Sequence, residues 1–261
     1  YLYLNNEGYA IDTIYQPSAV SYTNTDSNSD FYSESYVIAA IDSSDNVSPL
    51  SNFLPTIYLE GKLDTCKREI TLTWNRYKGV NHEVTEYRIY SSEDGNSYEL
   101  KGSVEGNDTT FSDETFSSYK EYCYYVEAIT DNGRSSLSNS SCLNTDLPVP
   151  PEWINADYAS INEHGNTSLS FTIDPASEYT RYIIERSADT LSGFQIIYDT
   201  SETGNRIEFT DESVSDGVWY YRMAAVNSCG ENIIYSNIAS TIQPELSLDR
   251  EIISLSWNKY Y

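Results

Sequence analysis

One strand signature occurs three times in this chain and limits the folds that the chain can adopt. A tyrosine, an apolar residue and an alanine occupy every second position, and a Ser-Asn pair follows ten or eleven residues after the alanine. Side chains two residues apart lie on the same face of a β-strand, so this alternation predicts strands. The three copies are Tyr36-x-Ile38-x-Ala40 with Ser51-Asn52, Tyr124-x-Val126-x-Ala128 with Ser138-Asn139, and Tyr221-x-Met223-x-Ala225 with Ser236-Asn237.

Further alternating patterns predict the other strands of each repeat. Aromatic residues make up 14% of the chain and methionine occurs once, a composition that favours sheet over helix bundles. We expect Tyr87, Tyr124, Tyr182 and Tyr221 to point inward, and Tyr122 and Tyr125 to point outward. The predicted strands contain Ile70-x-Leu72-x-Trp74, Leu169-x-Phe171-x-Ile173, Ile253-x-Leu255-x-Trp257, Tyr87-x-Ile89, Tyr182-x-Ile184, Phe111-Ser112-Asp113-Glu114 and Phe209-Thr210-Asp211-Glu212.

The spacing of the repeats predicts the domain organisation. Ala40 and Ala128 are 88 residues apart, and Ala128 and Ala225 are 97 residues apart, each close to the roughly 100 residues of one β-sandwich. The predicted domains are 1–57, the C-terminal part of a sandwich; 58–147 and 148–243, two complete sandwiches; and 244–261, the start of a further one.

The sequence also repeats with a longer period that spans two of these repeats. Residues 36–57 align without gaps with residues 221–242 at an offset of 185, and Trp74 aligns with Trp257 at an offset of 183. The repeating unit is therefore predicted to be a pair of unlike sandwiches.

The chain resembles fibronectin type III repeats over essentially its whole length. The similar residues are the early-strand tryptophans Trp74 and Trp257, the tyrosine strand around Tyr124, and the Ser-Asn strand that follows it; Phe171 departs from the pattern. The resemblance implies an all-β fold of tandem β-sandwiches in an end-to-end array. This fold occurs in proteins with many unrelated functions.

Three segments are also similar to tandem repeats of secreted Bacteroidota surface proteins. They are Ile70-Thr71-Leu72-Thr73-Trp74-Asn75-Arg76-Tyr77, Tyr122-Cys123-Tyr124-Tyr125-Val126 and Asn227-Ser228-Cys229-Gly230. This resemblance implies a location outside the cell, and a parent protein of the gliding-motility-associated type that is exported by type IX secretion. The sequence begins at Tyr1 without an initiator methionine, so we expect it to be an excerpt of a longer chain.

Charge and hydropathy exclude two classes of partner. The 40 acidic and 15 basic residues give a formal net charge of −25, and no run of Lys or Arg could neutralise a phosphate backbone. We therefore expect no nucleic-acid partner. No apolar stretch approaches the roughly 18 residues of a membrane span, so none is predicted in this segment.

The residue inventory does not predict an enzyme. The two histidines, His82 and His164, lie in polar loop contexts without a metal-binding or nucleophile motif, and no phosphate-binding or dinucleotide-binding loop occurs. We expect no catalytic residues and no cofactor. Asp26, Asn28 and Asp30 alternate as calcium-loop oxygens do, but the glycine and distal glutamate of such a loop are missing, so no metal site is predicted.

Two surface features leave alternatives open. Asn46, Asn107, Asn139 and Asn166 begin N-glycosylation sequons, which chance alone supplies in a chain so rich in Asn and Ser. Exposed tyrosines on a sheet can stack on sugar rings, although inward packing and cross-strand pairing explain the tyrosine content better.

The four cysteines predict two disulfides, because an even number in an exported chain favours a bonded framework. A hairpin that turns at Asn132-Gly133 places Cys123 opposite Cys142. Stacking two sandwiches end to end brings Cys229, in the last loop of one, to the pole where Cys66 begins its strand in the other. We therefore expect a second disulfide between Cys66 and Cys229. The alternatives are free thiols at Cys66 and Cys229, or bridges confined to the 58–147 domain.

These observations favour a non-catalytic spacer or stalk in a longer secreted or cell-surface protein, with other domains of the same chain as its partners. A rival prediction is an adhesin-type module that binds a glycan or a cell-surface protein. A second rival is an accessory region of a secreted polysaccharide hydrolase.

Overall fold

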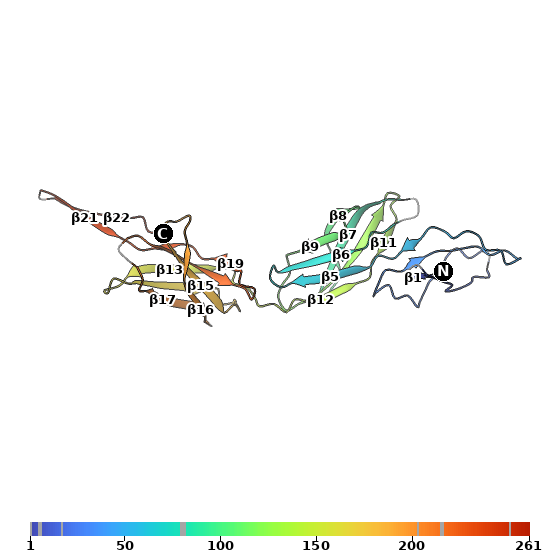
Figure 1. Cartoon of the computed structure of the whole chain (residues 1–261), viewed down its shortest axis with the longest axis horizontal. Helices are drawn as coiled ribbons and strands as arrows, with labels where there is room; N and C mark the ends of the chain where they lie inside the picture. Colours follow the sequence, from blue (N-terminus) through green and yellow to red (C-terminus); the bar gives the residue numbers. More distant parts are fainter. Residues whose placement is uncertain are drawn as a thin grey trace. The chain divides into compact units, whose positions relative to one another are not determined.

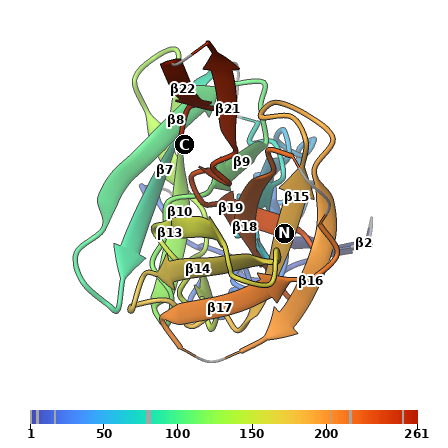
Figure 2. The same ribbon diagram turned by 90° about the vertical axis from the view of Figure 1, so that its left-hand side faces the viewer.

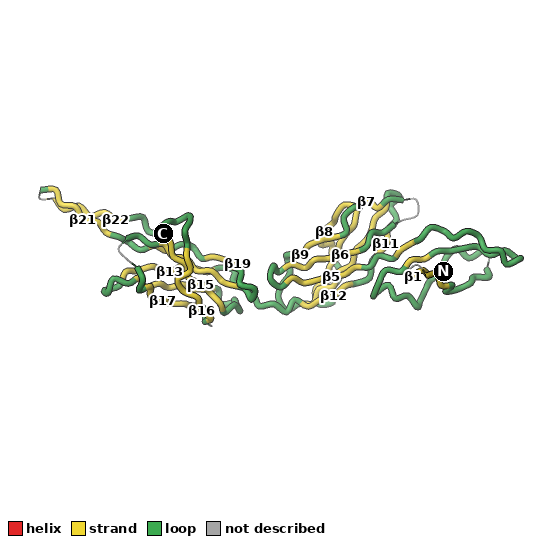
Figure 3. The backbone as a smooth tube through the Cα atoms, viewed as in Figure 1, coloured by secondary structure: helices red, strands yellow, loops and turns green. Residues whose placement is uncertain are grey.

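The computed structural model describes residues 2–4, 7–16, 18–78, 82–202, 204–214, 217–250 and 252–261. All regular secondary structure in these residues is β-strand (Figure 3). No described helix is long and apolar enough to cross a bilayer. The chain divides into two units, Tyr1–Asp146 and Leu147–Tyr261. The predicted all-β fold of tandem sandwiches is confirmed.

The first unit opens with a small sheet, which we call the N-terminal sheet. Its strand order is β2-β1-β3-β4, and all of its pairs are antiparallel. Figure 1 labels β1 of this sheet. Only Tyr36 of the first tyrosine signature lies in a strand, since Ile38 and Ala40 follow β3. The strands are β1 (Leu2–Leu4), β2 (Glu7–Tyr9), β3 (Ser35–Tyr36) and β4 (Leu54–Pro55).

The rest of the first unit is a β-sandwich, which we call the first sandwich. One sheet has the order β5-β6-β9; the other has the order β11-β10-β7-β8, and β12 also pairs with β10. The first, second and fifth strands thus form one sheet, and the other strands form the second. The strands are β5 (Leu59–Asp64), β6 (Glu69–Trp74), β7 (Val84–Glu93), β8 (Glu99–Glu105), β9 (Thr110–Asp113), β10 (Glu121–Thr130), β11 (Ser135–Leu137) and β12 (Ser141–Asn144).

The second unit repeats this topology in a second sandwich. Its sheets are β13-β14-β17 (Figure 2) and β16-β15-β18-β19, with β20 also pairing with β18. A separate hairpin of β21 and β22 follows, which we call the C-terminal hairpin. The strands are β13 (Ile154–Ile161), β14 (Thr167–Ile173), β15 (Arg181–Ser187), β16 (Gln195–Ser201), β17 (Arg206–Asp211), β18 (Tyr220–Val226), β19 (Asn232–Tyr235), β20 (Ala239–Ser240), β21 (Pro244–Asp249) and β22 (Ile252–Trp257).

The tyrosines divide between the two faces largely as the period-two pattern predicts. Tyr87, Tyr124, Tyr182 and Tyr221 are fully buried in the two cores, and Tyr125 lies on the outer face. The expectation that Tyr122 points outward was wrong, because it is only 5% exposed and belongs to the core of the first sandwich. Tyr122 and Tyr124 are two residues apart, so both side chains lie on the inner face.

The serine of each Ser-Asn pair completes hydrogen bonds of the tyrosine strand. In the first sandwich the hydroxyl of Ser138 accepts from the backbone N–H of Val126 at 2.9 Å, and the N–H of Ser138 donates to the carbonyl of Val126. Ser236 makes the same two bonds with Met223 in the second sandwich. The serine therefore supplies hydrogen-bond partners for the backbone N–H and carbonyl of the tyrosine strand at a point where the neighbouring strand is interrupted.

The asparagine of the pair connects the two sheets of each sandwich. The side chain of Asn139 accepts from the N–H of Leu59 at 2.6 Å and donates to its carbonyl at 3.0 Å. Asn237 makes the equivalent bonds with Ala156, at 2.8 and 3.2 Å. Leu59 and Ala156 lie in the first strands of their sandwiches, so one amide joins the segment before the last strand to the first strand.

We expect Asn139→Ala to lower the free energy of unfolding of the first sandwich by about 1–3 kcal/mol, because it leaves the N–H and carbonyl of a buried strand residue without these partners. Urea unfolding of the 261-residue chain measures the change, and hydrogen exchange assigns it to the first unit. Asn52→Ala is the matched control, since the exposed Asn52 side chain makes no hydrogen bond with the described residues. Equal losses in the two variants would contradict the role given to the amide.

Cys123 of β10 and Cys142 of β12 are direct cross-strand partners and form a disulfide. The hairpin register behind this pairing is less regular than the sequence suggested. Glu127 pairs with Leu137, and Cys123 pairs with Cys142. These two pairs are four residues apart along β10 but five residues apart along the opposite segment. The extra residue falls at the interruption between β11 and β12, where Ser138 and Asn139 lie.

Candidate functional site

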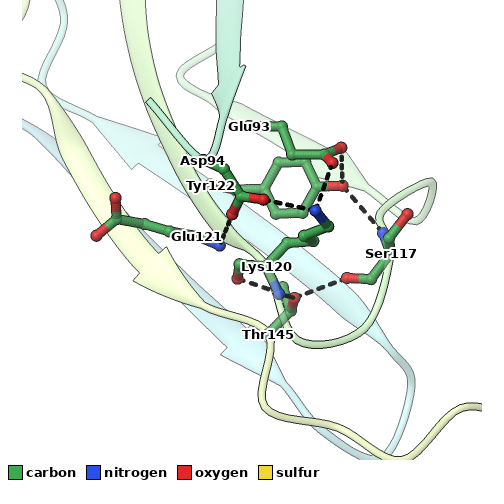
Figure 4. Close-up of polar contacts among 7 residues, drawn as sticks. All are labelled: Glu93, Asp94, Ser117, Lys120, Glu121, Tyr122 and Thr145. Carbon is green, nitrogen blue, oxygen red and sulfur yellow. Dashed lines mark hydrogen bonds and ion pairs between the residues drawn. The ribbon is translucent and has the colours of Figure 1, made fainter. Parts of the chain in front are cut away.

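A polar cluster lies at the corner where the chain enters β10 (Figure 4). The hydroxyl of Tyr122 donates to Glu93 at 2.8 Å and accepts from the N–H of Ser117 at 3.0 Å. The ammonium of Lys120 lies 3.4 Å from Glu93 and 2.5 Å from Asp94. Two carboxylates, one cation and a buried phenol therefore meet within one corner of the first sandwich.

Backbone hydrogen bonds hold the same corner together. The carboxylate of Asp94 accepts from the N–H of Glu121 at 3.0 Å, and the N–H of Asp94 donates to the carbonyl of Glu121. The hydroxyl of Thr145 donates to the carbonyl of Ser117 at 2.7 Å and accepts from the N–H of Lys120 at 3.1 Å. The side chains of Asp94, Tyr122 and Thr145 are thus bonded to the backbone of this corner.

The electrostatics of the corner stabilise its charged groups instead of activating them. Hydrogen bonds from Lys120 and from the N–H of Glu121 lower the pKa of Asp94, and Asp94 raises the pKa of Lys120. Burial is the main cause of the raised pKa of Tyr122. A tyrosine that begins this strand and bonds to the backbone a few residues upstream is a known corner structure of β-sandwiches. The cluster is therefore built to hold a loop.

An open, polar depression of about 590 Å³ lies beside this corner. Glu93 and Tyr122 belong to both, and Lys101 also lines the depression. Its walls offer hydroxyl, amide and carboxylate groups that could bind a polar ligand. Lys101 is held at 2.9 Å by Asp113, and Glu93 by Tyr122, so two of its charged side chains already have partners.

A buried carboxylate joins three elements of the first sandwich. Asp113, 2% exposed at the end of β9, accepts from the hydroxyl of Tyr124 at 2.8 Å and pairs with Lys101 at 2.9 Å. The N–H of Thr115 donates to its other oxygen at 2.8 Å. Burial opposes ionisation of Asp113, but these three partners favour it more strongly and lower its pKa.

The second sandwich contains the same arrangement. Asp211 ends β17, is 2% exposed, and accepts from the hydroxyl of Tyr221 at 3.2 Å. Arg186 lies 2.7 Å from it, and the N–H of Ser213 donates to it at 3.0 Å. The pKa of Asp211 is also lowered, because these hydrogen bonds outweigh its burial. Because the arrangement occurs in both sandwiches, it is a part of the fold and not an active site that one domain alone contains.

These two carboxylates should make the chain sensitive to acid. Their folded-state pKa values lie below the ordinary value of 3.8, so the unfolded chain binds protons first as the pH falls. Their contribution is fully present above about pH 4 and is lost as the pH falls through the folded-state pKa. Urea midpoints between pH 3 and pH 6 should fall less steeply in Asp113→Asn than in the wild-type chain. Parallel curves would contradict this prediction.

A group of tyrosines that bears on the exposed-tyrosine hypothesis lies on the outer face of the first sandwich. Tyr90 and Tyr125 stack across β7 and β10 with their ring centres 4.8 Å apart, and Tyr98 tilts against Tyr125 at the same distance. The hydroxyls of Tyr90 and Tyr98 are bonded to Glu127 and Ser140. The rings thus contact one another, and Tyr98, at 39%, presents the most exposed surface of the three.

The other residues singled out in the sequence lie apart from this corner. His82 is exposed and contacts Asp131 at 2.8 Å, and the exposed His164 lies in the turn between β13 and β14. Cys66 and Cys229 are disulfide-bonded, and their pairing with each other stays a prediction. Around the suspected calcium loop, the N–H of Asn28 donates to Glu34 at 3.0 Å. Within the described ranges no cluster of three metal-binding side chains occurs.

The sequon asparagines differ in what their amides contact. The amide of Asn139 is bonded to Leu59 in the fold, and that of Asn46 donates to Asp42 at 2.8 Å. Sequence analysis missed Lys101 and Arg186 as partners of the buried aspartates. The repeated Phe-x-Asp-Glu pattern marked both aspartates, but no local pattern marks the cations, which lie on other strands.

No protein-family model and no curated protein matches the sequence. Among solved structures, the chicken CNTN1 FN1–FN3 domains are 19% identical, with a TM-score of 0.36 over 78% of this chain and 74% of that chain. Pectate lyase Pel3 from Pectobacterium carotovorum is 21% identical, with a TM-score of 0.30 over 36% of this chain. Pectate lyase PelI from Erwinia chrysanthemi, in complex with tetragalacturonic acid, is 19% identical, with a TM-score of 0.30 over 33%.

The match spans 28% of each pectate lyase chain. At such low identity and TM-score these likenesses carry no argument about activity or ligand. The strand order and register of this chain define its fold.

Proposed function

We propose that this segment is a non-catalytic spacer in a longer secreted or cell-surface protein, where it separates or displays other domains of the same chain. The observation that carries the proposal is the repetition of its buried polar groups. Tyr124 with Asp113 and Tyr221 with Asp211 form the same arrangement in successive sandwiches, and Asn139 and Asn237 make the same sheet-to-sheet bonds. Polar groups that recur in this way maintain a repeated fold.

Two further properties suit an external spacer. A net charge of −25 favours solubility and discourages self-association. Disulfide-bonded cysteines, such as Cys123 and Cys142, persist in oxidising compartments outside the cytosol. The finer assignment, a gliding-motility-associated Bacteroidota protein exported by type IX secretion, is supported by the sequence resemblance.

A binding module is the second candidate, because Tyr98 and Leu100 expose apolar surface next to the polar depression that Glu99 and Lys101 line. The occupant would be a polysaccharide whose rings lie on Tyr98 and whose hydroxyls contact these charged groups. The accessory-region hypothesis requires this same surface, since a substrate-targeting domain must bind its polysaccharide.

A binding and turnover screen separates these functions. The purified chain is applied to a glycan array and incubated with soluble polysaccharides, polygalacturonate included. We expect neither retention nor release of reducing ends. Tyr98→Ala is the test variant and Tyr235→Ala, a similarly exposed tyrosine of the second sandwich, is its control. Binding that Tyr98→Ala abolishes and Tyr235→Ala retains would replace the spacer by a glycan-binding module, and turnover would contradict the non-catalytic assignment.

We also propose that Cys66 and Cys229 bond to each other and stiffen the spacer, as end-to-end stacking of the sandwiches predicts. Non-reducing peptide mapping is the measurement. We expect one cross-linked peptide with Cys66 and Cys229 and another with Cys123 and Cys142. A peptide that joins Cys66 to any other cysteine would overturn the proposal.

A further inference from the structure

A single amide joins the N-terminal sheet to the first sandwich. Asn75 directly follows β6, and its side-chain oxygen accepts from the N–H of Tyr58 at 2.6 Å. Its side-chain nitrogen donates to the carbonyl of Thr56 at 3.0 Å and to the hydroxyl of Ser33 at 3.3 Å. Thr56 and Tyr58 flank Ile57, where the chain passes from one body to the next. Both ends of the linker are therefore bonded to one side chain.

The residue that the amide holds is itself attached to the preceding body. The N–H of Thr56 donates to the carbonyl of Glu34 at 2.7 Å, and the hydroxyl of Thr56 accepts from the N–H of Glu34 at 2.9 Å. Asn75 belongs to the sandwich that follows. Its two hydrogen bonds to the linker thus connect one body, through Thr56, to the other.

The second unit contains the same contacts at its own joint. Asn258 directly follows β22, accepts from the N–H of Gln243 at 2.7 Å and donates to the carbonyl of Thr241 at 2.9 Å. Thr241 is in turn bonded through its N–H and hydroxyl to Trp219, at 3.0 Å each. The second sandwich and the C-terminal hairpin are therefore connected as the N-terminal sheet and the first sandwich are.

The linker that begins the second unit is held differently, and the backbone N–H of Asp174 donates to the carbonyl of Trp153 at 3.2 Å. Ile173 is the last residue of β14, and Trp74 is the last residue of β6. Asp174 therefore stands at the position in the second sandwich that corresponds to Asn75. Asp174 accepts from the N–H of Glu152 at 3.0 Å and from that of Ala176 at 2.9 Å. These two bonds lower its pKa, so near neutral pH its carboxylate has no proton to donate to a linker carbonyl.

We propose that Asn75 and Asn258 are binding sites for the backbone of the linker and act as clamps at every second joint of the repeat. Each clamp binds one N–H and one carbonyl of an extended peptide, which an amide side chain can do because it has an acceptor oxygen and a donor nitrogen. Both clamped joints lie inside a unit, Asn75 in Tyr1–Asp146 and Asn258 in Leu147–Tyr261. Amide clamps of this kind then recur with the two-sandwich period of the sequence.

The test uses amide hydrogen exchange of the full 261-residue chain, followed by NMR. In Asn75→Ala we expect the Tyr58 amide to exchange roughly tenfold faster, because its acceptor is lost, while the Gln243 amide is unchanged. Asn258→Ala should show the reverse. Each variant is the control for the other, and Leu72, in the centre of β6, reports on the core. Unchanged exchange at Tyr58, or an equal rise at Leu72, would overturn the proposal.

The donor half of the clamp is tested separately with Asn75→Asp, which gives this joint the residue found at position 174. We expect the Tyr58 amide to stay within about twofold of wild type, because a carboxylate oxygen still accepts its hydrogen bond. Chymotrypsin should nevertheless cleave after Tyr58 several times faster than in wild type, since the bond to Thr56 is lost. Cleavage at the wild-type rate would show that the amide donor does not hold the joint.

Discussion

Replacement of Asp113 by alanine should lower the free energy of unfolding of the first sandwich by about 3 kcal/mol, the largest loss that we expect from one polar substitution. Removing one partner of a buried ion pair costs about 3–5 kcal/mol, because the remaining charge stays without compensation. The value should fall at the lower end, since the side chain of Lys101 is 22% exposed and can reach water. Tyr124 is fully buried, so its hydroxyl cannot reach water.

Urea unfolding of the full chain measures this loss, with hydrogen exchange to assign it to the first unit. Asp131→Ala is the matched control, because Asp131 pairs with His82 at a site where both side chains are 41–50% exposed. An exposed pair contributes at most about 1 kcal/mol. Asp113→Asn keeps an acceptor for Tyr124 and should give an intermediate loss. A loss in Asp113→Ala no greater than that of the control would show that the buried carboxylate does not stabilise the sandwich.

Removal of the Cys123–Cys142 disulfide in the variant Cys123→Ser/Cys142→Ser should lower the free energy of unfolding by about 3 kcal/mol. The two cysteines are 19 residues apart in sequence, and closing a loop of this length reduces the entropy of the unfolded chain by about that amount. Urea unfolding under non-reducing conditions is the measurement. In contrast to Asp113→Ala, the effect acts on the unfolded state, so the cross-strand register of β10 should persist.

The control for the disulfide is Glu121→Ser/Asn144→Ser, a neighbouring cross-strand pair in the same two strands that has no covalent bond. We expect this control to lose less than about 1 kcal/mol, as is usual for exposed positions. If both double variants lose the same amount, the stabilisation comes from the strand pairing and not from the cross-link.

The fold was largely predictable because its signal is local. Period-two alternation marked strands such as β6, β14 and β18, and the same pattern placed Tyr87 and Tyr182 in the cores. The error at Tyr122 shows how strict this rule is. Its spacing of two residues from Tyr124 already places Tyr122 on the inner face.

The polar framework was less predictable because its partners are distant in sequence. The Ser-Asn pair was visible as a repeat, yet its role depends on Leu59, which lies 80 residues before Asn139 and contacts it only once the sandwich closes. Lys101 and Asp113 are on different strands that the core brings together. Hydrogen-bond complementarity of this kind produces no local alternation along a strand.

The sequence by itself therefore determined the fold class, the strands and the two-sandwich period, because burial of alternate apolar side chains is set residue by residue along each strand. Only the tertiary structure decided the roles of Asn75, Asn139 and Asp113. Each is a polar residue that local pattern would place in an ordinary turn or strand end. Each acquires its role because chain closure brings one donor or acceptor within 3 Å of it and removes the water that would otherwise take that place.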